Sequence, residues 1–311
     1  MAYITVGKEN SEPIQVYFED HGMGTPVVLI HGFPLSGAAW EKQVAALLHA
    51  GYRTITYDRR GFGKSSQPTI DYEYDTFAAD LHALMSQLDL HDAVLVGHSM
   101  GTGEVTRYLG TYGSARVKKA VLVAPIPPFL LKSPENPAGV DKGTIDGVVR
   151  SIAADRFAYL TAFLRDFYNL DVTLGKRVSE DVVRANFNVA AGASAVGTAA
   201  CPPTWLTDFR SDLPRIDVPL LIIQGDADRI LPFAATGKRL HEAIKGSQLV
   251  ALAGAPHGIP WTHADEVNRA LLDFLDKDQP AAGARTGPGV DIPAGIEAMR
   301  TQNGQDMRPT P

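Results

Sequence analysis

The stretch Val94-Leu95-Val96-Gly97-His98-Ser99-Met100-Gly101-Thr102-Gly103 decides the fold of this chain. It starts apolar and β-branched, a serine follows Gly97 by two positions, and helical spacing of apolar residues begins at Val105. This pattern predicts a strand, a sharp turn and a helix, with Gly-x-Ser-x-Gly at the turn. The Ser99 hydroxyl would project above the sheet, and the N–H of Met100 would lie at a helix N-terminus, where negative charge is stabilised. A glycine-rich turn without chemistry would share the motif, so the motif alone leaves both interpretations open.

The segments on either side alternate between strand and helix patterns. Strands are predicted near residues 3–6, 14–19, 27–30, 52–57, 93–96, 117–124, 218–224 and 248–252. Helices are predicted near residues 36–48, 75–88, 100–112, 234–244 and 263–275, with Ser36 placed to cap the first. Short continuous apolar runs such as Val27 to Ile30 are typical of strands buried on both faces. The order predicts an α/β fold with a mostly parallel eight-stranded sheet and helices on both faces.

Two regions break this alternation. Between residues 125 and 212, prolines cluster and are followed by helical patterns at about 144–168 and 179–200, without strands between them. This predicts a helical cap inserted into a core formed by residues 1–124 and 213–277. Residues 278–311 are rich in glycine and proline and lack an amphipathic period, which predicts a flexible C-terminal tail.

Composition excludes several classes of function. The 311 residues are 45% hydrophobic and 21% charged with a net charge of −6, which argues against nucleic acid and anionic membranes as partners. No secretory leader pattern or membrane-length apolar run is found, so we expect a cytoplasmic protein. The single cysteine, Cys201, excludes an internal disulfide and a cysteine-rich metal site. Because His-Glu-x-x-His and a strand-linked Gly-x-Gly-x-x-Gly are also missing, we expect no metal and no cofactor.

A reactive serine needs a base, and that base needs an orienting carboxylate. His257 lies in a loop directly after a predicted strand, at the sheet edge where α/β proteins bind ligands. His241 falls within a helical pattern and His263 opens the last helix, so packing or surface roles are favoured for both. The carboxylate should follow the preceding strand, where Asp226 and Asp228 both occur, and spacing does not choose between them.

The loop Asp58-Arg59-Arg60-Gly61-Phe62-Gly63-Lys64-Ser65 allows two interpretations. Its cations and glycines could bind an anion. We favour a structural role, in which the glycines shape the turn and the charges hold the loop in place.

Several motifs of the sequence resemble those of a known superfamily. Gly-His-Ser-Met-Gly, His-Gly-Phe-Pro, the loop 58–65, Gly-Asp-Ala-Asp-Arg and Pro-His-Gly look like the α/β-hydrolases, over residues 1 to about 276 and in the order Ser, Asp, His. More closely, residues 208–212, 216–219, 231–233 and 261–264 resemble the cofactor-free bacterial haloperoxidases, also called perhydrolases or aryl esterases. The resemblance does not extend to the tail.

The resemblance implies a catalytic triad of Ser99, Asp228 and His257, with Asp228 rather than Asp226 as the acid. It implies an oxyanion hole built from the N–H groups of Phe33 and Met100. The implied reaction is hydrolysis of carboxylic esters through an acyl-enzyme, with hydrogen peroxide replacing water to form a peracid that oxidises halide without metal, haem or flavin. It also implies a homo-oligomer such as a trimer.

Apolar residues near the predicted catalytic loops are expected to bind the substrate, with core packing as the alternative for each. They are Phe33, Ile126, Phe129, Trp205, Ile230, Phe233 and Ile259. Haloalkane dehalogenases and epoxide hydrolases have an aspartate at the position of Ser99, so Ser99 disfavours both. A lactonase, a lactamase or a carbon–carbon bond hydrolase would keep the serine triad, and a small-molecule receptor could use the same fold with no turnover.

Overall fold

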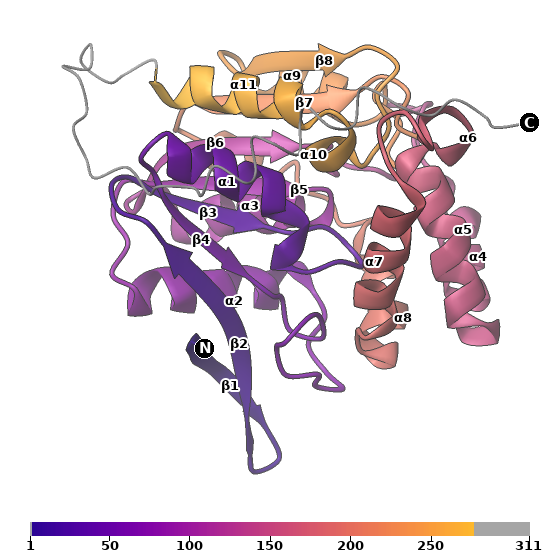
Figure 1. Ribbon diagram of the computed structural model, residues 1–311, viewed down its shortest axis with the longest axis horizontal. Coiled ribbons are helices and arrows are strands. Elements are labelled where there is room, and N and C mark those ends of the chain that lie inside the picture. The colour runs from indigo at the N-terminus through magenta and orange to yellow at the C-terminus, as the bar shows by residue number, and fades with distance from the viewer. Residues whose placement is uncertain (1, 277–311) are drawn as a thin grey trace, which may run out of the picture. The chain divides into compact units, whose positions relative to one another are not determined.

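A computed structural model describes residues 2–276, and its centre is an eight-stranded sheet in the order β1-β2-β4-β3-β5-β6-β7-β8 (Figure 1). β1 and β2 pair antiparallel, β2 pairs antiparallel with β4, and every other neighbouring pair is parallel. The predicted fold class is therefore confirmed. The strands are β1 (Ala2–Glu9), β2 (Glu12–His21), β3 (Pro26–Ile30), β4 (Arg53–Tyr57), β5 (Ala93–His98), β6 (Val117–Val123), β7 (Leu220–Gly225) and β8 (Gln248–Leu252).

Helices cover both faces of the sheet. They are α1 (Glu41–His49), α2 (Tyr74–Gln87), α3 (Met100–Tyr112), α9 (Gly237–Ala243) and α11 (Ala264–Asp276), with the short elements η1 (Gly37–Trp40), η2 (Leu213–Arg215) and α10 (Ile259–Thr262). Successive strand residues point to opposite faces. On β3, Val28 packs in a buried cluster with Leu81 of α2, whereas Val27 packs with Leu47 of α1 and Leu271 of α11. The continuous apolar runs of the central strands are thus explained by burial on both sides.

The helices between β6 and β7 gather at one end of the sheet, on the right of Figure 1. They are α4 (Lys142–Ala154), α5 (Arg156–Tyr168), α6 (Leu170–Thr173), α7 (Glu180–Ala191) and α8 (Ala195–Thr204). Each long predicted helix is divided in two. Asp155 is extended and its carboxylate accepts the N–H of Ala158, and Ser194 accepts the N–H of Gly197, so each polar side chain begins a new helix. The limits predicted for the cap, residues 125–212, stay a prediction.

The start of the first helix differs from expectation. Ser36 makes no capping hydrogen bond, and residues 37–40 form the 3₁₀ turn η1 before α1 begins at Glu41. The carboxylate of Asp58, from the loop after β4, instead accepts the N–H of Gly37 at 2.8 Å. The capping partner therefore comes from a neighbouring loop, where local sequence cannot reveal it.

Among residues 2–276, no helix is both long and apolar enough to cross a membrane. The predicted tail, residues 278–311, lies outside the described residues.

Candidate active site

Ser99 lies on a strained turn between β5 and α3. Its φ of 53° and ψ of −119° place a non-glycine residue in left-handed backbone, which costs of order 1–3 kcal/mol. The turn is also crowded. A Cβ on Gly97 would lie 2.5 Å from the carbonyl oxygen of Gly101, and a Cβ on Gly101 would lie 2.4 Å from that of Ile30. Only glycine fits at both positions, which explains the Gly-x-Ser-x-Gly spacing.

His257 and Asp228 meet beneath the loops that follow β7 and β8. The Nδ1 of His257 and Oδ2 of Asp228 are 2.7 Å apart, and both side chains are fully buried. The other carboxylate oxygen of Asp228 accepts the N–H groups of Ile230 at 2.9 Å and Leu231 at 2.8 Å. The Nε2 of His257 is buried with no hydrogen-bond partner among the described residues. This nitrogen is therefore the one free to exchange a proton.

Asp226 has a different environment. It is exposed, and its carboxylate accepts the N–H of Gly254 at 2.7 Å, so it joins the loops after β7 and β8 at the surface. His241 and His263 likewise lie apart from Asp228: their Nδ1 atoms contact the hydroxyls of Ser247 and Thr262, both at 2.9 Å.

The loop of residues 31–34, named the oxyanion loop for its predicted role, packs against the serine. A Cβ on Gly32 would lie 2.9 Å from the Cβ of Ser99, so a glycine is needed for this approach. Met100 is the first residue of α3, and its N–H therefore has no acceptor within the helix. The N–H of Phe33 has no partner among the described residues. Two donors thus remain free at the loop and the turn that flank Ser99.

Arg59 connects the oxyanion loop to α3. Its Nη2 donates to the carbonyl of His31 at 2.9 Å, and its Nε donates to the carboxylate of Glu104 at 2.8 Å. Both side chains of this ion pair are buried, with exposed fractions of 1% and 0%. The hydroxyl of Tyr57 also hydrogen-bonds Glu104. The pair therefore fixes the end of β3 relative to α3.

The other residues of the loop 58–65 confirm that its charges have a structural role. Arg60 forms a two-pronged pair with Asp80, at 2.7 Å for each bond, and Asp58 accepts N–H groups of Gly37 and Lys64. The charges of the loop hold it in place through partners within the protein.

Two further histidines beside the site are held neutral by burial. The Nε2 of His31 accepts the N–H of Arg59 at 2.9 Å, so its proton lies on Nδ1, facing the carbonyl of Gly32. Burial, reinforced by the charge of Arg59, lowers the pKa of His31 well below its usual value. Burial and then the neighbouring His257 lower the pKa of His98 to about 3. Neither adds positive charge next to Ser99 near neutral pH.

An aromatic cluster joins Phe33 of the oxyanion loop to the helices between β6 and β7. Of the seven residues predicted to bind substrate, four belong to it: Phe33, Ile126, Trp205 and Ile230. The ring of Phe33 makes edge contacts with Phe163 of α5 at 5.6 Å and with Trp205 at 5.1 Å. Sequence reasoning missed Phe163 and Phe167, because their helical spacing with Leu160 and Leu164 indicates only a buried helix face.

The other three residues lie outside this cluster, and their expected role in substrate binding stays a prediction. Ile259 opens α10 and packs with Ala255 on the face of the sheet covered by α1 and α11. Phe129 is half-buried under the guanidinium of Arg210, 5.0 Å from the ring centre. Phe233 is half-buried and outside the aromatic cluster.

A search of residues 2–276 for metal-binding groups of three or more His, Cys, Asp or Glu side chains gives none. Cys201 is fully buried, and burial raises the pKa of its thiol to about 12.

Comparison with known proteins agrees with this fold. A family model described as alpha/beta hydrolase fold matches residues 25–264. A Synechocystis sp. protein provisionally named as a non-heme chloroperoxidase is 65% identical over 275 residues, covering 88% of this chain and all of that protein. A bifunctional esterase/perhydrolase of Acinetobacter calcoaceticus is 35% identical, covering 88% and 99%. The crystal structure of a bromoperoxidase from Bacillus anthracis is 50% identical with a TM-score of 0.85, covering 88% and 99%. The chain therefore belongs to the α/β-hydrolase superfamily and, within it, to the non-heme haloperoxidase family.

Proposed function

We propose that this protein is a serine hydrolase that cleaves small carboxylic esters through an acyl-enzyme on Ser99 and that also transfers the acyl group to hydrogen peroxide. The observation that carries the proposal is the fully buried His257–Asp228 pair, whose free Nε2 belongs to the same site as the strained Ser99. The relative from Acinetobacter calcoaceticus, named an esterase/perhydrolase, supports both activities.

In the first half-reaction, the Oγ of Ser99 attacks the ester carbonyl while its proton passes to Nε2 of His257. Asp228 holds the imidazole through Nδ1 and stabilises the imidazolium that forms. The negative oxygen of the tetrahedral intermediate is held by the N–H groups of Phe33 and Met100. Loss of one such donor typically lowers the rate by about 10² to 10³. The intermediate then collapses, His257 gives its proton to the leaving oxygen, and the alcohol departs.

In the second half-reaction, His257 removes a proton from water or hydrogen peroxide, which attacks the acyl-enzyme. Water yields the carboxylic acid, and peroxide yields the peracid; Ser99 regains its proton in both cases. The peracid then transfers one oxygen atom to chloride or bromide in solution, giving hypohalous acid and the carboxylate. Halide oxidation therefore follows from acyl transfer, and the oxidant is the hydrogen peroxide consumed.

The acyl group is expected to lie against the aromatic cluster beneath the cap. Phe33, Phe163 and Trp205 contact one another there and are buried. A site enclosed by fixed rings favours a small acyl group, because larger groups would have to displace well-packed side chains.

A panel of p-nitrophenyl and aryl esters, assayed with and without hydrogen peroxide and bromide, tests the proposal. We expect ester hydrolysis without peroxide and bromination only when peroxide and an ester or carboxylic acid are both present. Labelling with a fluorophosphonate separates an enzyme from a receptor, because only a competent Ser99 reacts. Failure of the protein both to react with the probe and to hydrolyse any ester of the panel would refute the proposal. A chelator should leave all activities unchanged.

A further inference from the structure

The turn from α5 to α6 lies against the loops that carry the proposed acid and base. Phe167, Tyr168 and Asn169 form this turn, the α5–α6 corner, and all three side chains are buried. Asn169 has a φ of 51° and a ψ of 55°, a left-handed conformation that asparagine adopts more readily than most residues. The helix α5 therefore ends here, and the chain turns into α6.

On the acid side, the corner holds the peptide bond that leads into Asp228. The Nδ2 of Asn169 donates to the carbonyl of Ala227 at 2.9 Å, and Ala227 directly precedes Asp228. The N–H of Ala227 is bound in turn to the carbonyl of Ala255 at 3.2 Å. Because the Ala227 carbonyl belongs to the peptide unit that it shares with Asp228, the amide of Asn169 helps to fix the direction in which the Asp228 side chain projects.

On the base side, the corner contacts both His257 and the residue that follows it. The carbonyl of Phe167 accepts the N–H of Gly258 at 2.8 Å, and the ring of Phe167 makes an edge contact with His257, with ring centres 5.1 Å apart. A Cβ on Gly258 would lie 2.6 Å from the ring of Tyr168, so a glycine is needed for this approach. Two loops from different strands are thus joined to one three-residue segment.

The backbone of the corner does not by itself explain the asparagine. The Oδ1 of Asn169 is buried with no hydrogen-bond partner among the described residues, and burying an unpartnered polar atom costs free energy. A glycine would adopt the same left-handed backbone without that cost. What the amide adds is the hydrogen bond from Nδ2 to Ala227.

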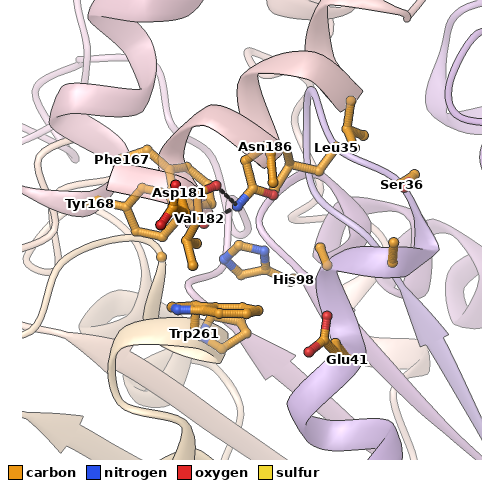
Figure 2. Close-up of a pocket in the computed structure, with 16 residues that line it drawn as sticks. Leu35, Ser36, Glu41, His98, Phe167, Tyr168, Asp181, Val182, Asn186 and Trp261 are labelled. Carbon is orange, nitrogen blue, oxygen red and sulfur yellow. Dashed lines mark hydrogen bonds between the residues drawn. The ribbon is translucent and has the colours of Figure 1, made fainter. Parts of the chain in front are cut away.

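The corner is held by hydrogen bonds more than by dense packing. A cavity of about 300 Å³ lies against Phe167 and Tyr168 (Figure 2). The Tyr168 hydroxyl accepts a hydrogen bond from Nδ2 of Asn186 at 3.0 Å, and Figure 2 shows this pair across the cavity from Trp261. The hydroxyl of Thr173 donates to the carbonyl of Tyr168 at 2.7 Å. Because a cavity adjoins the corner, its position depends on these directional bonds.

We propose that the α5–α6 corner positions the acid and base of the triad and that Asn169 is the residue that fixes Asp228. The inference rests on the proposed serine hydrolase function. Asp228 and His257 come from separate loops, so their 2.7 Å contact requires both loops to be held in register. A displacement of about 1 Å at a catalytic group can cost about 10²-fold in rate. Asn169 acts through the backbone of Ala227 and is therefore a positioning residue.

Two substitutions at Asn169 separate the amide from the backbone. Asn169→Gly keeps the left-handed conformation and removes the side chain. Asn169→Asp keeps the shape of the side chain but turns a carboxylate oxygen toward the Ala227 carbonyl in place of the donor. We expect kcat to fall about tenfold in Asn169→Gly and about 10²-fold in Asn169→Asp, equally for acetate and hexanoate esters, while KM stays as in the wild type.

Asp171→Asn is the matched control. It breaks an ion pair with Arg229 that links α6 to the loop of the proposed acid, so it also removes a contact between these two segments. Both side chains are exposed, and such pairs contribute little. We expect Asp171→Asn to leave kcat within about twofold of the wild type.

Proton NMR gives a readout that needs no substrate. The proton held between Nδ1 of His257 and Oδ2 of Asp228 should resonate downfield of the amide protons, because a short charge-assisted hydrogen bond deshields it. We expect this resonance to move upfield or to be lost by exchange in both Asn169 variants and to be unchanged in Asp171→Asn. Circular dichroism checks the fold, and Asn169→Gly carries the comparison if Asn169→Asp does not fold.

The combined results distinguish the positioning role from the hydrolase function. A wild-type kcat in the Asn169 variants, or a reduced kcat with the wild-type resonance, would overturn the role of Asn169. A rise in KM alone would do the same, since Asn169 would then act on substrate binding. If the resonance responds to Asn169 but the wild type neither hydrolyses esters nor reacts with a fluorophosphonate, the positioning role stands and the proposed hydrolase function fails.

Discussion

The two sides of the site are held together by different forces. On the core side, the groups around Ser99 are fixed by directional bonds: Asp228 to His257, Asp228 to two backbone N–H groups, and Arg59 to His31 and Glu104. On the cap side, Phe33, Phe163 and Trp205 are fixed by packing alone. Hydrogen bonds impose distances and angles, whereas apolar contacts impose only shape and volume. The core side is therefore suited to setting the reaction, and the cap side to choosing the substrate.

This difference predicts separable effects of substitution. Changes on the core side should alter the chemical step for every substrate alike, because each substrate meets the same few polar atoms. Changes on the cap side should alter the ranking of substrates while the chemical step persists.

Ser99→Ala should abolish ester hydrolysis and peroxide-dependent bromination together, since the proposed route passes both reactions through one acyl-enzyme. By analogy with other serine triads, the expected fall in kcat is about 10⁶. Steady-state assays of both reactions on one preparation, with folding checked by circular dichroism, measure it. Bromination that survives the substitution would require a separate redox centre and would show that halide oxidation does not depend on Ser99.

Asp228→Asn keeps the shape of the side chain but lets the amide favour the wrong imidazole tautomer. We expect kcat to fall by about 10⁴ with little loss of folding. Asp226→Asn is the matched control, because its carboxylate instead joins two surface loops through the N–H of Gly254. It should cost about 1 kcal/mol of stability and retain most of the rate. Kinetics and urea midpoints on both variants decide it; the opposite result would make Asp226 the acid.

Glu104→Gln should disturb the core side without touching substrate. The variant leaves Arg59 buried without its counter-charge, and breaking such a pair typically costs about 3–5 kcal/mol. Because Arg59 also holds the carbonyl of His31, we expect kcat to fall for all esters alike while KM changes little.

The double variant Arg59→Met/Glu104→Leu provides the control for this prediction. It removes both charges, so stability should recover, while the oxyanion loop loses its link to α3 and kcat stays low. If kcat recovers together with stability, the pair serves folding alone.

The difference between directional bonds and packing also explains which features of the site could be predicted from the sequence. Ser99 and its glycines form one contiguous motif, because the steric demands of the turn fall on neighbouring residues. The choice between Asp226 and Asp228 could not be made from spacing, since both follow the same strand. It depends on which carboxylate turns inward, and in the structure Asp228 contacts His257 while Asp226 is exposed.

The cap side was harder to predict. Ile259 and Phe129 both adjoin predicted catalytic loops in sequence, yet Ile259 packs with α1 and α11 while Phe129 lies under Arg210, and sequence did not distinguish these two environments. The breaks at Asp155 and Ser194 were also missed, because apolar periodicity continues across a short capping segment. Packing between helices that are far apart in sequence is only weakly reflected in the order of residues.

Phe163→Leu tests the cap side. The substitution removes an edge contact with Phe33 and opens space beneath the cap at a cost of about 1 kcal/mol. We expect kcat/KM for hexanoate esters to rise about tenfold relative to acetate esters, whereas the dependence of kcat on pH stays as in the wild type. Measuring both acyl series across pH shows whether selectivity and chemistry separate. A shifted pH profile would contradict the separation, because it would mean that α5 also tunes the base.

The smallest expected effect concerns stability and belongs to the core side. Burial lowers the pKa of His98 to about 3, so between pH 6.5 and 3 the unfolded chain binds a proton at this residue that the folded chain does not. The contribution of neutral His98 to the free energy of unfolding is therefore fully present above pH 6.5. It is lost as pH falls, by about 1.4 kcal/mol per pH unit, or about 2 kcal/mol at pH 5. His98→Gln can still donate to the carbonyl of His257 but does not titrate, so its urea-unfolding free energy should fall less between pH 7.5 and pH 5 than that of the wild type. His49→Gln, at an exposed position on α1, should show the wild-type dependence. If the unfolding free energy of His98→Gln depends on pH as in the wild type, the His98 imidazole is already charged in the folded protein. The core side would then carry a positive charge next to Ser99.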